Sequence, residues 1–240
     1  MESPAIHRQR RTQLRSEHTM LKAVIFDVDG TLVDSVDAHA RSWWETLAEF
    51  GHDVDYERVR HQIGKGGDQL MREFLSDAEI RENGERIEKA RKDRYMRRYI
   101  DGVRGFPKVR ELFQHIRDSG RRVALASSAG GDELGAYKEK TRIADLVEEE
   151  TSKDDVEQSK PHPDIFQAAL DQLCGVRAAE AIVVGDTPWD AIAAKGAGLR
   201  MVGVLCGGFD EKELREAGCI AIFQSPADLL ARFDESPLGA

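Results

Sequence analysis

Two aspartates separated by one residue, Asp27 and Asp29, directly follow the apolar run Ala23–Phe26. The run has the length and composition of a buried strand. In an open α/β sheet, ligands bind at the carboxyl ends of the strands. Side chains of a regular strand alternate between its faces, so both carboxylates can reach one substrate only where the chain bends, and Gly30 permits such a bend. The pair suggests a metal site, a nucleophile with its acid–base partner, or both.

Polar residues of a consistent kind stand at three further points in the sequence. They are Ser127 and Ser128 after the run Val123–Ala126, Lys160 before a predicted helix over 164–173, and Asp186 and Asp190 after the run Ala181–Val184. In a doubly wound sheet all of them gather along one edge. Acids hold a hard dication through oxygen, and the dication and a lysine neutralise phosphoryl oxygens. The set therefore suits phosphoryl transfer.

The rest of the chain predicts the elements that position these residues. Strands are expected at 23–26, 123–126, 146–149, 181–184, 201–205 and 219–222, with helical patterns between them from residue 107 onward. This alternation predicts an α/β fold whose parallel sheet is covered on both faces. Residues 35–102 show helical patterns only, which predicts a helical insertion after the first strand. A core domain of residues 20–34 and 103–240 follows from this division.

Composition narrows the function classes. The chain has 240 residues, of which 40% are hydrophobic and 33% charged, and a formal charge of −9 that disfavours general nucleic-acid binding. No apolar run approaches the about 18 residues of a membrane span. Three cysteines without metal-site spacing favour a reducing compartment. We expect a cytoplasmic protein that binds neither nucleic acid nor membrane, and a disordered tail over the arginine-rich residues 1–19.

The ordered motifs identify a family resemblance. The chain resembles the haloacid dehalogenase-like (HAD) hydrolase superfamily, in the branch with a helical cap after the first strand. The four motifs of that family are matched in order by DVDGT at 27–31, by Ser127 after an apolar strand, by Lys160 in SKPHPDIF, and by Asp186 and Asp190 in GDTPWD. The resemblance covers about residues 21–230. It implies a Rossmann-like doubly wound core with an inserted α-helical cap.

The resemblance implies a role for each matched residue. Asp27 attacks phosphorus and forms an aspartyl phosphate. Asp29 protonates the leaving oxygen and then takes a proton from the hydrolytic water. Lys160 balances the negative charge, and Ser127 contacts a phosphoryl oxygen, with Ser128 as a secondary contact. Mg²⁺ is held by the carboxylates of Asp27 and Asp186 and by the main-chain carbonyl of Asp29, and Asp190 supports it from further out.

The residue two after the nucleophile narrows the chemistry further. Haloacid dehalogenases do not carry an aspartate there, and the related phosphonate hydrolases carry a small residue, so Asp29 points away from both. Phosphate-ester hydrolases of the phosphoglycolate phosphatase type and β-phosphoglucomutases remain. The mutases place an arginine in the cap loop to hold a second phosphate, and none occurs between Ile63 and Asp68. His39 resembles a mutase hinge histidine, but similar sequences occur in phosphatases.

The expected substrate is therefore a small phosphorylated metabolite, such as phosphoglycolate or a sugar phosphate. In the cap, the glycine-rich turn around Lys65 and Gly66 precedes a helix, where backbone amides could contact an anionic or polyol group. A simple helix–helix turn is the alternative for this segment. Two other functions stay open: a β-phosphoglucomutase-like phosphotransferase, and a non-enzymatic module that docks a partner. The sequence leaves monomer and homodimer equally open.

Overall fold

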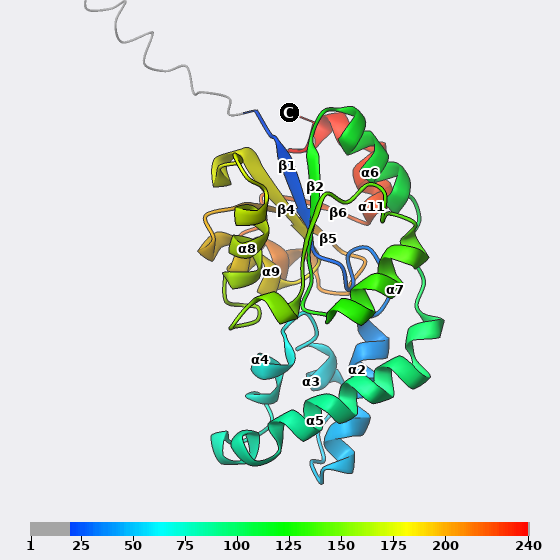
Figure 1. Cartoon of the computed structure of the whole chain (residues 1–240), viewed down its shortest axis with the longest axis vertical. Coiled ribbons are helices and arrows are strands. Elements are labelled where there is room, and N and C mark those ends of the chain that lie inside the picture. Colours follow the sequence, from blue (N-terminus) through cyan, green and yellow to red (C-terminus); the bar gives the residue numbers. More distant parts are fainter. Residues whose placement is uncertain (1–19, 240) are drawn as a thin grey trace, which may run out of the picture.

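A six-stranded parallel sheet forms the centre of the molecule (Figure 1). The computed structural model describes residues 20–239, so the predicted tail over 1–19 lies outside the described residues. The strands are β1 (Ala23–Phe26), β2 (Arg122–Ala126), β3 (Glu149–Thr151), β4 (Ala181–Gly185), β5 (Arg200–Val204) and β6 (Ala221–Phe223). Their order in the sheet is β3-β2-β1-β4-β5-β6. Because the order reverses at β1, the sheet is doubly wound, and the predicted fold class is confirmed.

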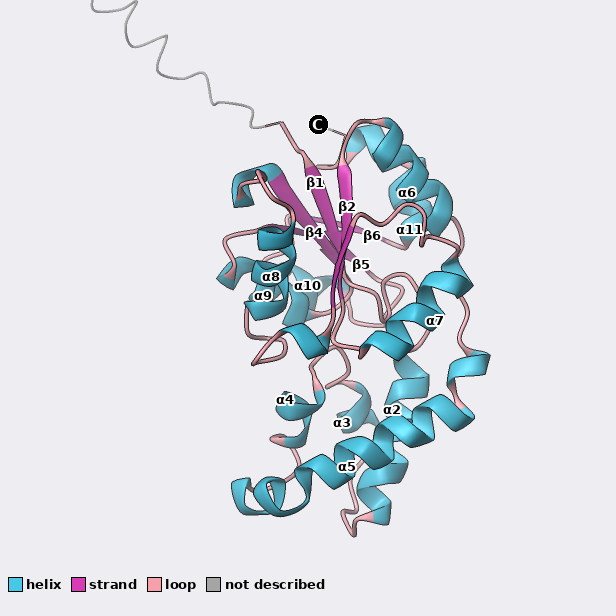
Figure 2. Cartoon of the chain, in the orientation of Figure 1, coloured by secondary structure: helices cyan, strands magenta, loops and turns pink. Residues whose placement is uncertain are grey.

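Helices cover both faces of this sheet (Figure 2). They are α6 (Val109–Asp118), α7 (Gly131–Thr141) and α11 (Pro226–Ala231) on one face, and α8 (Asp164–Gln172), α9 (Pro188–Gly196) and α10 (Glu211–Ala217) on the other. Strand β1 shows why both faces need cover. Val24 and Phe26 pack with the first helix group, and Ala23 and Ile25 pack with the second. A strand that is apolar on both sides requires a parallel, fully covered sheet.

Two of the predicted strands are displaced along the chain. The strand predicted at 146–149 begins at Glu149 instead, and the strand predicted at 219–222 is Ala221–Phe223. In both places an apolar residue lies at the end of a helix or in the turn that follows, and it contributes to the core from there: Leu146 and Cys219 are buried outside the strands. Apolar content alone therefore does not separate an edge strand from the turn before it.

Four of the helices between β1 and β2 form a separate layer beyond the carboxyl ends of the strands (Figure 1). They are α2 (Val36–Glu49), α3 (Tyr56–Arg60), α4 (Gly67–Met71) and α5 (Asp77–Arg98). These helices have an apolar cluster of their own, which includes Trp43, Leu47, Leu70 and Ile87. The all-helical cap is thus confirmed. We propose that residues 35–102 are its limits as a domain.

Helix α5 has one buried face, and not all of the residues on that face are apolar. The buried positions are Gly84, Ile87, Arg91 and Tyr95, at a spacing of three or four residues. This spacing places them on one face of the helix. Arg91 therefore occupies a position in the buried row where an apolar side chain is expected. Within the described residues, no helix combines the length and apolarity that crossing a bilayer requires.

Candidate active site

Strand ends and one loop bring the predicted acids and the lysine to a single point. One carboxylate oxygen from each of Asp27, Asp186 and Asp190 lies within 4.8 Å of the others, and all three residues are buried. Asp27 follows β1 and Asp186 follows β4, which are neighbours in the sheet. Asp190 reaches the same point from the first turn of α9. The topology therefore converts three separate sequence motifs into one acidic cluster.

Lys160 lies inside this acidic cluster. Its side chain is 1% exposed, and its Nζ pairs with Asp27 Oδ1 and lies 2.8 Å from Asp190 Oδ1. It also lies 3.3 Å from the carbonyl oxygen of Ala126. Burial alone would lower the pKa of this amine, but the carboxylates of Asp190 and Asp27 raise it above its usual value. Lys160 is therefore a fixed, protonated counterion for the nucleophile candidate.

Asp186 has a carboxylate oxygen without a partner in the described residues. Its Oδ1 accepts a hydrogen bond of 2.8 Å from the Thr31 hydroxyl, which also lies 3.2 Å from Asp27 Oδ2. Its Oδ2 is buried and makes no hydrogen bond. Burial raises the pKa of Asp186 well above the usual value, and the charges of Asp27 and Asp190 add to the effect. A buried, unpartnered carboxylate oxygen beside two other acids is the environment that a cation relieves.

Asp190 serves two neighbours. Its Oδ2 accepts hydrogen bonds from the backbone N–H and the hydroxyl of Thr187, at 3.0 and 2.7 Å. Thr187 in turn caps the backbone N–H of Asp190, which completes a capping box at the start of α9. The other oxygen pairs with Lys160. Asp190 therefore belongs both to the capping box of α9 and to the charged site.

Asp29 points to a different set of partners from Asp27. Its Oδ1 accepts a hydrogen bond of 2.6 Å from the Ser35 hydroxyl and lies 2.8 Å from His39 Nε2. Burial opposes ionisation of Asp29, but His39 and the hydrogen bonds from His39 and Ser35 outweigh it and lower the pKa to about 2. The carboxylate is therefore held in a defined orientation.

Two tyrosines, which the sequence motifs do not contain, continue this network. The Tyr137 hydroxyl lies 3.0 Å from His39 Nε2 and 2.5 Å from the Tyr95 hydroxyl. The Tyr95 ring stacks on the His39 ring, with centroids 4.0 Å apart. Tyr95 comes from the cap helix α5 and Tyr137 from the core helix α7. The cap and the core thus both hold the His39 ring in place. Its Nε2 contacts Asp29, so His39 is linked to the catalytic candidates through that carboxylate.

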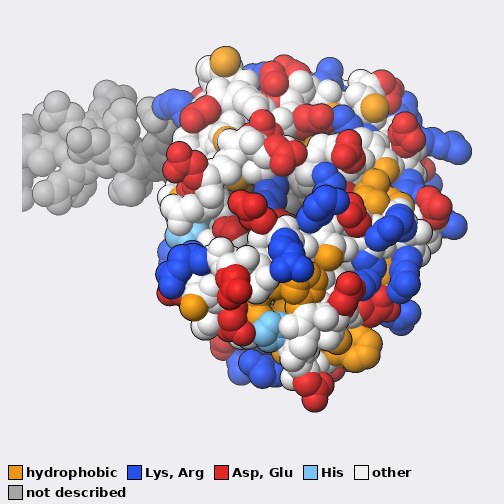
Figure 3. All heavy atoms as spheres, turned by 60° about the horizontal axis from the view of Figure 1, so that its bottom comes forward, with side chains coloured by type: hydrophobic (Ala, Val, Ile, Leu, Met, Phe, Trp, Pro, Cys, Tyr) orange, Lys and Arg blue, Asp and Glu red, His pale blue; other side chains and the backbone are white. Residues whose placement is uncertain are grey.

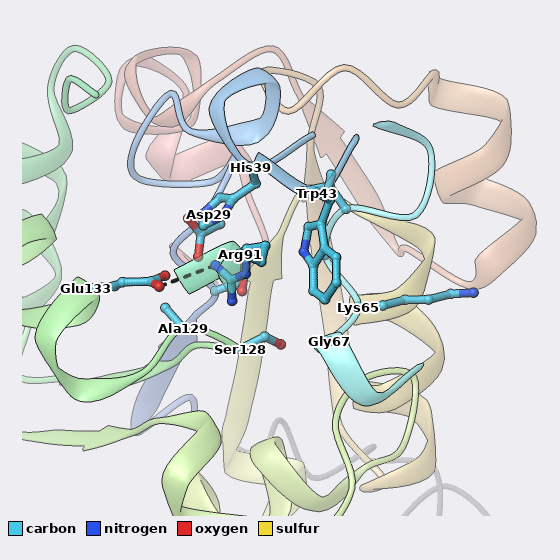
Figure 4. A pocket seen from close by; sticks show the side chains of 12 residues that line it. Asp29, His39, Trp43, Lys65, Gly67, Arg91, Ser128, Ala129 and Glu133 are labelled. Atoms are coloured by element: carbon cyan, nitrogen blue, oxygen red, sulfur yellow. Dashed lines mark hydrogen bonds and ion pairs between the residues drawn. The ribbon is translucent and has the colours of Figure 1, made fainter. Parts of the chain in front are cut away.

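A cavity of about 40 Å³ opens between cap and core beside the two motif aspartates (Figure 4). Its lining includes Asp27, Asp29, His39 and Ser128 from the predicted set. It also includes Trp43, Arg91 and Glu133, which the sequence motifs did not point to. Arg91 could have been recognised from its place in the buried row of α5. No pattern distinguishes Glu133 in the sequence.

The comparisons with known proteins agree with this geometry. The family model of the haloacid dehalogenase-like hydrolases matches residues 21–198. The chain belongs to the haloacid dehalogenase-like hydrolase family. Its match to that model spans the first aspartate motif, the lysine and the second pair of acids.

Relatives of this HAD hydrolase cover most of its length. A phosphoglycolate phosphatase from Rhodospirillum rubrum is 31% identical over 218 residues, which are 88% of this chain and 90% of that protein. The protein CbbY from Rhodobacter capsulatus is 34% identical over 196 residues, 76% of this chain and 84% of that one. A crystal structure of a hydrolase from Pseudomonas syringae has a TM-score of 0.81 at 30% identity, covering 89% of this chain and 98% of that one. The HAD hydrolase is an enzyme with phosphatase relatives.

The two serines of the HAD hydrolase directly follow β2 and differ in their surroundings. Ser127 is fully buried, and its Oγ accepts a hydrogen bond of 3.1 Å from the backbone N–H of Ala129. Ser128, which was expected to be secondary, lines the cavity. The turn after β2 thus directs the second serine toward the cavity, because the first one closes the turn. A phosphate contact by either serine stays a prediction.

Lys65 lies in the wall of the cavity, but its amine points away from it (Figure 4). The Nζ pairs with Glu73 at 2.8 Å and lies 4.0 Å from the centre of the Trp189 ring. Lys65 therefore joins the cap to helix α9 of the core in this structure. A direct substrate contact by its amine stays a prediction.

Gly66 brings the cap loop against the core. A Cβ atom at this position would lie 2.1 Å from both Cβ and Oγ of Ser159, which precedes Lys160. The next turn of the cap adds a contact, because the backbone N–H of Ser159 donates to Asp68 Oδ2 at 3.4 Å. Gly66 is needed here for close approach of the two loops. Whether its backbone also contacts substrate stays a prediction.

We expect Gly66→Ala to impair catalysis without unfolding the protein. The backbone at Gly66 has a φ of −71°, which alanine adopts readily, so the added methyl group acts only by pushing the cap loop away from Ser159. Misplacement of about 1 Å can reduce a rate by roughly a hundredfold. Steady-state kinetics should show kcat/KM reduced by about tenfold or more. Gly102→Ala is the matched control, because no atom lies within 4 Å of a Cβ there; equal activity of the two variants would contradict the expectation.

Proposed function

We propose that this HAD hydrolase is a magnesium-dependent phosphatase that hydrolyses a small phosphorylated metabolite, of the phosphoglycolate or sugar-phosphate type, through an aspartyl phosphate on Asp27. The observation that carries the proposal is the buried ion pair of Asp27 with Lys160 beside two further acids. Burial raises the pKa of Asp27 to about 7, and the neighbouring charge of Lys160 opposes that rise and favours the carboxylate. This carboxylate can attack an electrophile, and the phosphatase relatives support phosphorus as that electrophile.

The acidic cluster supports magnesium as the cofactor. Asp27 and Asp186 would hold the ion through carboxylate oxygens, and the unpartnered Oδ2 of Asp186 fits this role. The backbone carbonyl of Asp29 would complete the protein ligands. Asp190 would not bind the ion directly but would hold Lys160 in place beside it. Two carboxylates and a carbonyl are oxygen donors, the kind of ligand that Mg²⁺ prefers. When bound, the ion would withdraw negative charge from the phosphoryl oxygens.

The reaction then divides between two aspartates. Asp27 attacks phosphorus, and Lys160 opposes the rise in the pKa of Asp27 that burial causes and neutralises charge that gathers at the phosphoryl group. Asp29, oriented by Ser35 and His39, would give a proton to the leaving oxygen. Because its pKa of about 2 makes it a carboxylate in this structure, this step requires that Asp29 take up a proton when the substrate binds. In the second half of the reaction Asp29 takes a proton from the water that cleaves the aspartyl phosphate. The carboxylate form in which Ser35 and His39 hold Asp29 suits this second step.

The β-phosphoglucomutase-like alternative has less support. A mutase must bind a second phosphate, and Arg91 is the arginine that lines the cavity in the described residues. Its guanidinium is already paired with Glu133 at 3.3 Å. No other observation favours transfer to a second substrate position over transfer to water. Interconversion of hexose 1- and 6-phosphates that depends on a bisphosphate primer would establish the alternative.

The cysteines and the surface charge bear on where the enzyme acts and on what it binds. Cys174, Cys206 and Cys219 are free thiols, which supports a cytoplasmic location. Acidic and basic side chains interleave on the cap end of the molecule (Figure 3). This mixture, with the net charge of −9, supports a small-molecule substrate over nucleic acid. We infer that the enzyme acts on free metabolites as a monomer or homodimer.

Metal removal tests the proposal directly. Phosphate release from p-nitrophenyl phosphate should fall to background after dialysis against EDTA, because three buried carboxylates then face the phosphoryl group with Lys160 as the remaining cation. Added Mg²⁺ should restore it. Colorimetric phosphate detection measures both steps, and an enzyme that keeps its activity after dialysis would contradict the proposed metal dependence.

A further inference from the structure

An ion pair spans the cavity from cap to core (Figure 4). Arg91 of the cap helix α5 places its Nη1 3.3 Å from Glu133 Oε1 of the core helix α7. Arg91 is 8% exposed and Glu133 1% exposed. Both residues line the same cavity as the two motif aspartates. The pair thus shares this cavity with Asp27, the proposed nucleophile.

Each member of the pair keeps one atom without a hydrogen bond. Glu133 Oε2 and Arg91 Nε are buried and have no partner among the described residues. The Arg91 guanidinium is held further by the ring of Trp43, whose centre lies 5.3 Å away. Buried polar atoms without partners are costly, and they are usually satisfied by a ligand or by water. The pair therefore carries one acceptor and one donor that no group of the described residues satisfies.

The charge of the pair decides which ligand group fits. Because Arg91 is already neutralised by Glu133, the pair has no net charge. A hydroxyl group both donates and accepts without carrying a charge, so it matches a neutral pair that holds both a donor and an acceptor. A carboxylate or a second phosphate could accept from Arg91, but it would meet the charge of Glu133 and that of Asp29 nearby. Like charges in a buried site are strongly disfavoured.

We propose that the Arg91–Glu133 pair determines specificity, and that it selects phosphate esters of small neutral polyols over esters that carry a carboxylate or a second phosphate. This inference rests on the proposed phosphatase activity and chooses within its substrate range. The cavity volume of about 40 Å³ agrees with a leaving group of few atoms in this arrangement of cap and core. Discrimination then comes from Glu133, which rejects anions, as much as from the contacts to the hydroxyl.

Two matched substrates isolate this effect. Glycerol 3-phosphate and 3-phosphoglycerate have the same three-carbon chain and phosphate position, and they differ in a terminal CH₂OH against a carboxylate. The ratio of their kcat/KM values is measured by phosphate release for each protein separately. Because both values come from one preparation, the ratio does not depend on how much of a variant is folded. Wild-type enzyme should favour glycerol 3-phosphate.

Three variants then test the pair. Glu133→Gln leaves the charge of Arg91 uncompensated and should shift the ratio toward 3-phosphoglycerate by about tenfold to a hundredfold, the effect of one charged hydrogen bond. Arg91→Gln leaves Glu133 unpaired and should shift the ratio in the opposite direction. Asp132→Asn is the control, because Asp132 pairs with Lys92 at 3.4 Å between the same two helices but is exposed and away from the cavity. Its ratio should equal that of wild type.

The outcomes separate this inference from the function on which it rests. If wild-type enzyme prefers 3-phosphoglycerate, or if Glu133→Gln leaves the ratio unchanged, the specificity role of the pair is wrong while the phosphatase stands. An equal shift in Asp132→Asn would also refute it, because any cap–core ion pair would then do the same. If wild-type enzyme releases phosphate from neither substrate nor from p-nitrophenyl phosphate, the proposed function itself fails and the specificity role fails with it.

Discussion

Replacement of Asp27 by asparagine should reduce kcat for phosphate release by about 10⁴-fold or more. An amide has nearly the shape of the carboxylate, but its oxygen is a weak nucleophile, and Lys160 cannot keep it charged. The loss is therefore chemical, because the neutral side chain still fits the buried space after β1. Turnover of p-nitrophenyl phosphate with saturating Mg²⁺ measures it.

A surface carboxylate provides the control for this variant. Asp37→Asn removes an exposed acid in the first turn of α2, whose partner is Arg60 at 2.7 Å. It should retain wild-type kcat. If Asp27→Asn also retained wild-type turnover, another group would have to attack phosphorus, and the aspartyl-phosphate mechanism would be wrong.

Replacement of Lys160 by methionine should abolish activity and also destabilise the metal-free protein. The amine pairs with Asp27 and Asp190, so its loss leaves three buried carboxylates within 4.8 Å of one another without their fixed cation. Removal of one partner of a buried ion pair costs about 3–5 kcal/mol. Urea unfolding in EDTA should show a lower free energy of unfolding by this order, because burial of the unbalanced charge opposes folding.

Magnesium distinguishes this charge effect from simple loss of packing. Since the ion binds the folded protein through the same acids, added Mg²⁺ should recover part of the lost stability of Lys160→Met. Lys195→Met, at an exposed position of α9, is the control and should be as stable as wild type. A Lys160→Met protein that is as stable as wild type in EDTA would show that the acids do not need the amine as a counterion.

Much of the fold follows from local patterns of the sequence. The run Ala23–Phe26 is apolar at every position, and only a strand covered on both faces buries all four side chains. The order of the family motifs then fixed Asp27, Lys160, Asp186 and Asp190 as candidates, and the structure brings these four together. Apolar patterns predicted the strand bounds less well at the two edges of the sheet, because Leu146 and Cys219 are buried in turns that precede the edge strands. There the tertiary environment, and not the local composition, decides where a strand begins.

The cavity lining shows where sequence reasoning stopped. Tyr95 lies in the strongly charged sequence of α5, yet its ring stacks on His39 and its hydroxyl contacts Tyr137. Arg91 belongs to that same charged stretch, and its partner Glu133 is 42 residues further along the chain. Nothing in local periodicity relates two such positions, because their distance depends on how the cap helices lie on the core.

The sequence by itself therefore determined the chemistry of this protein, and the tertiary structure decided what surrounds it. Parallel strands end at one edge of a sheet, so the residues that follow them meet there whatever the rest of the chain does, and motifs at strand ends predict a reactive centre. The cap has no such constraint. The cap contributes two contacts to the site, Arg91 with Glu133 and Tyr95 with His39. Both contacts depend on the packing of α5 against α2 and α7. That packing is set by side-chain shape and charge across the whole interface, which no short stretch of sequence contains.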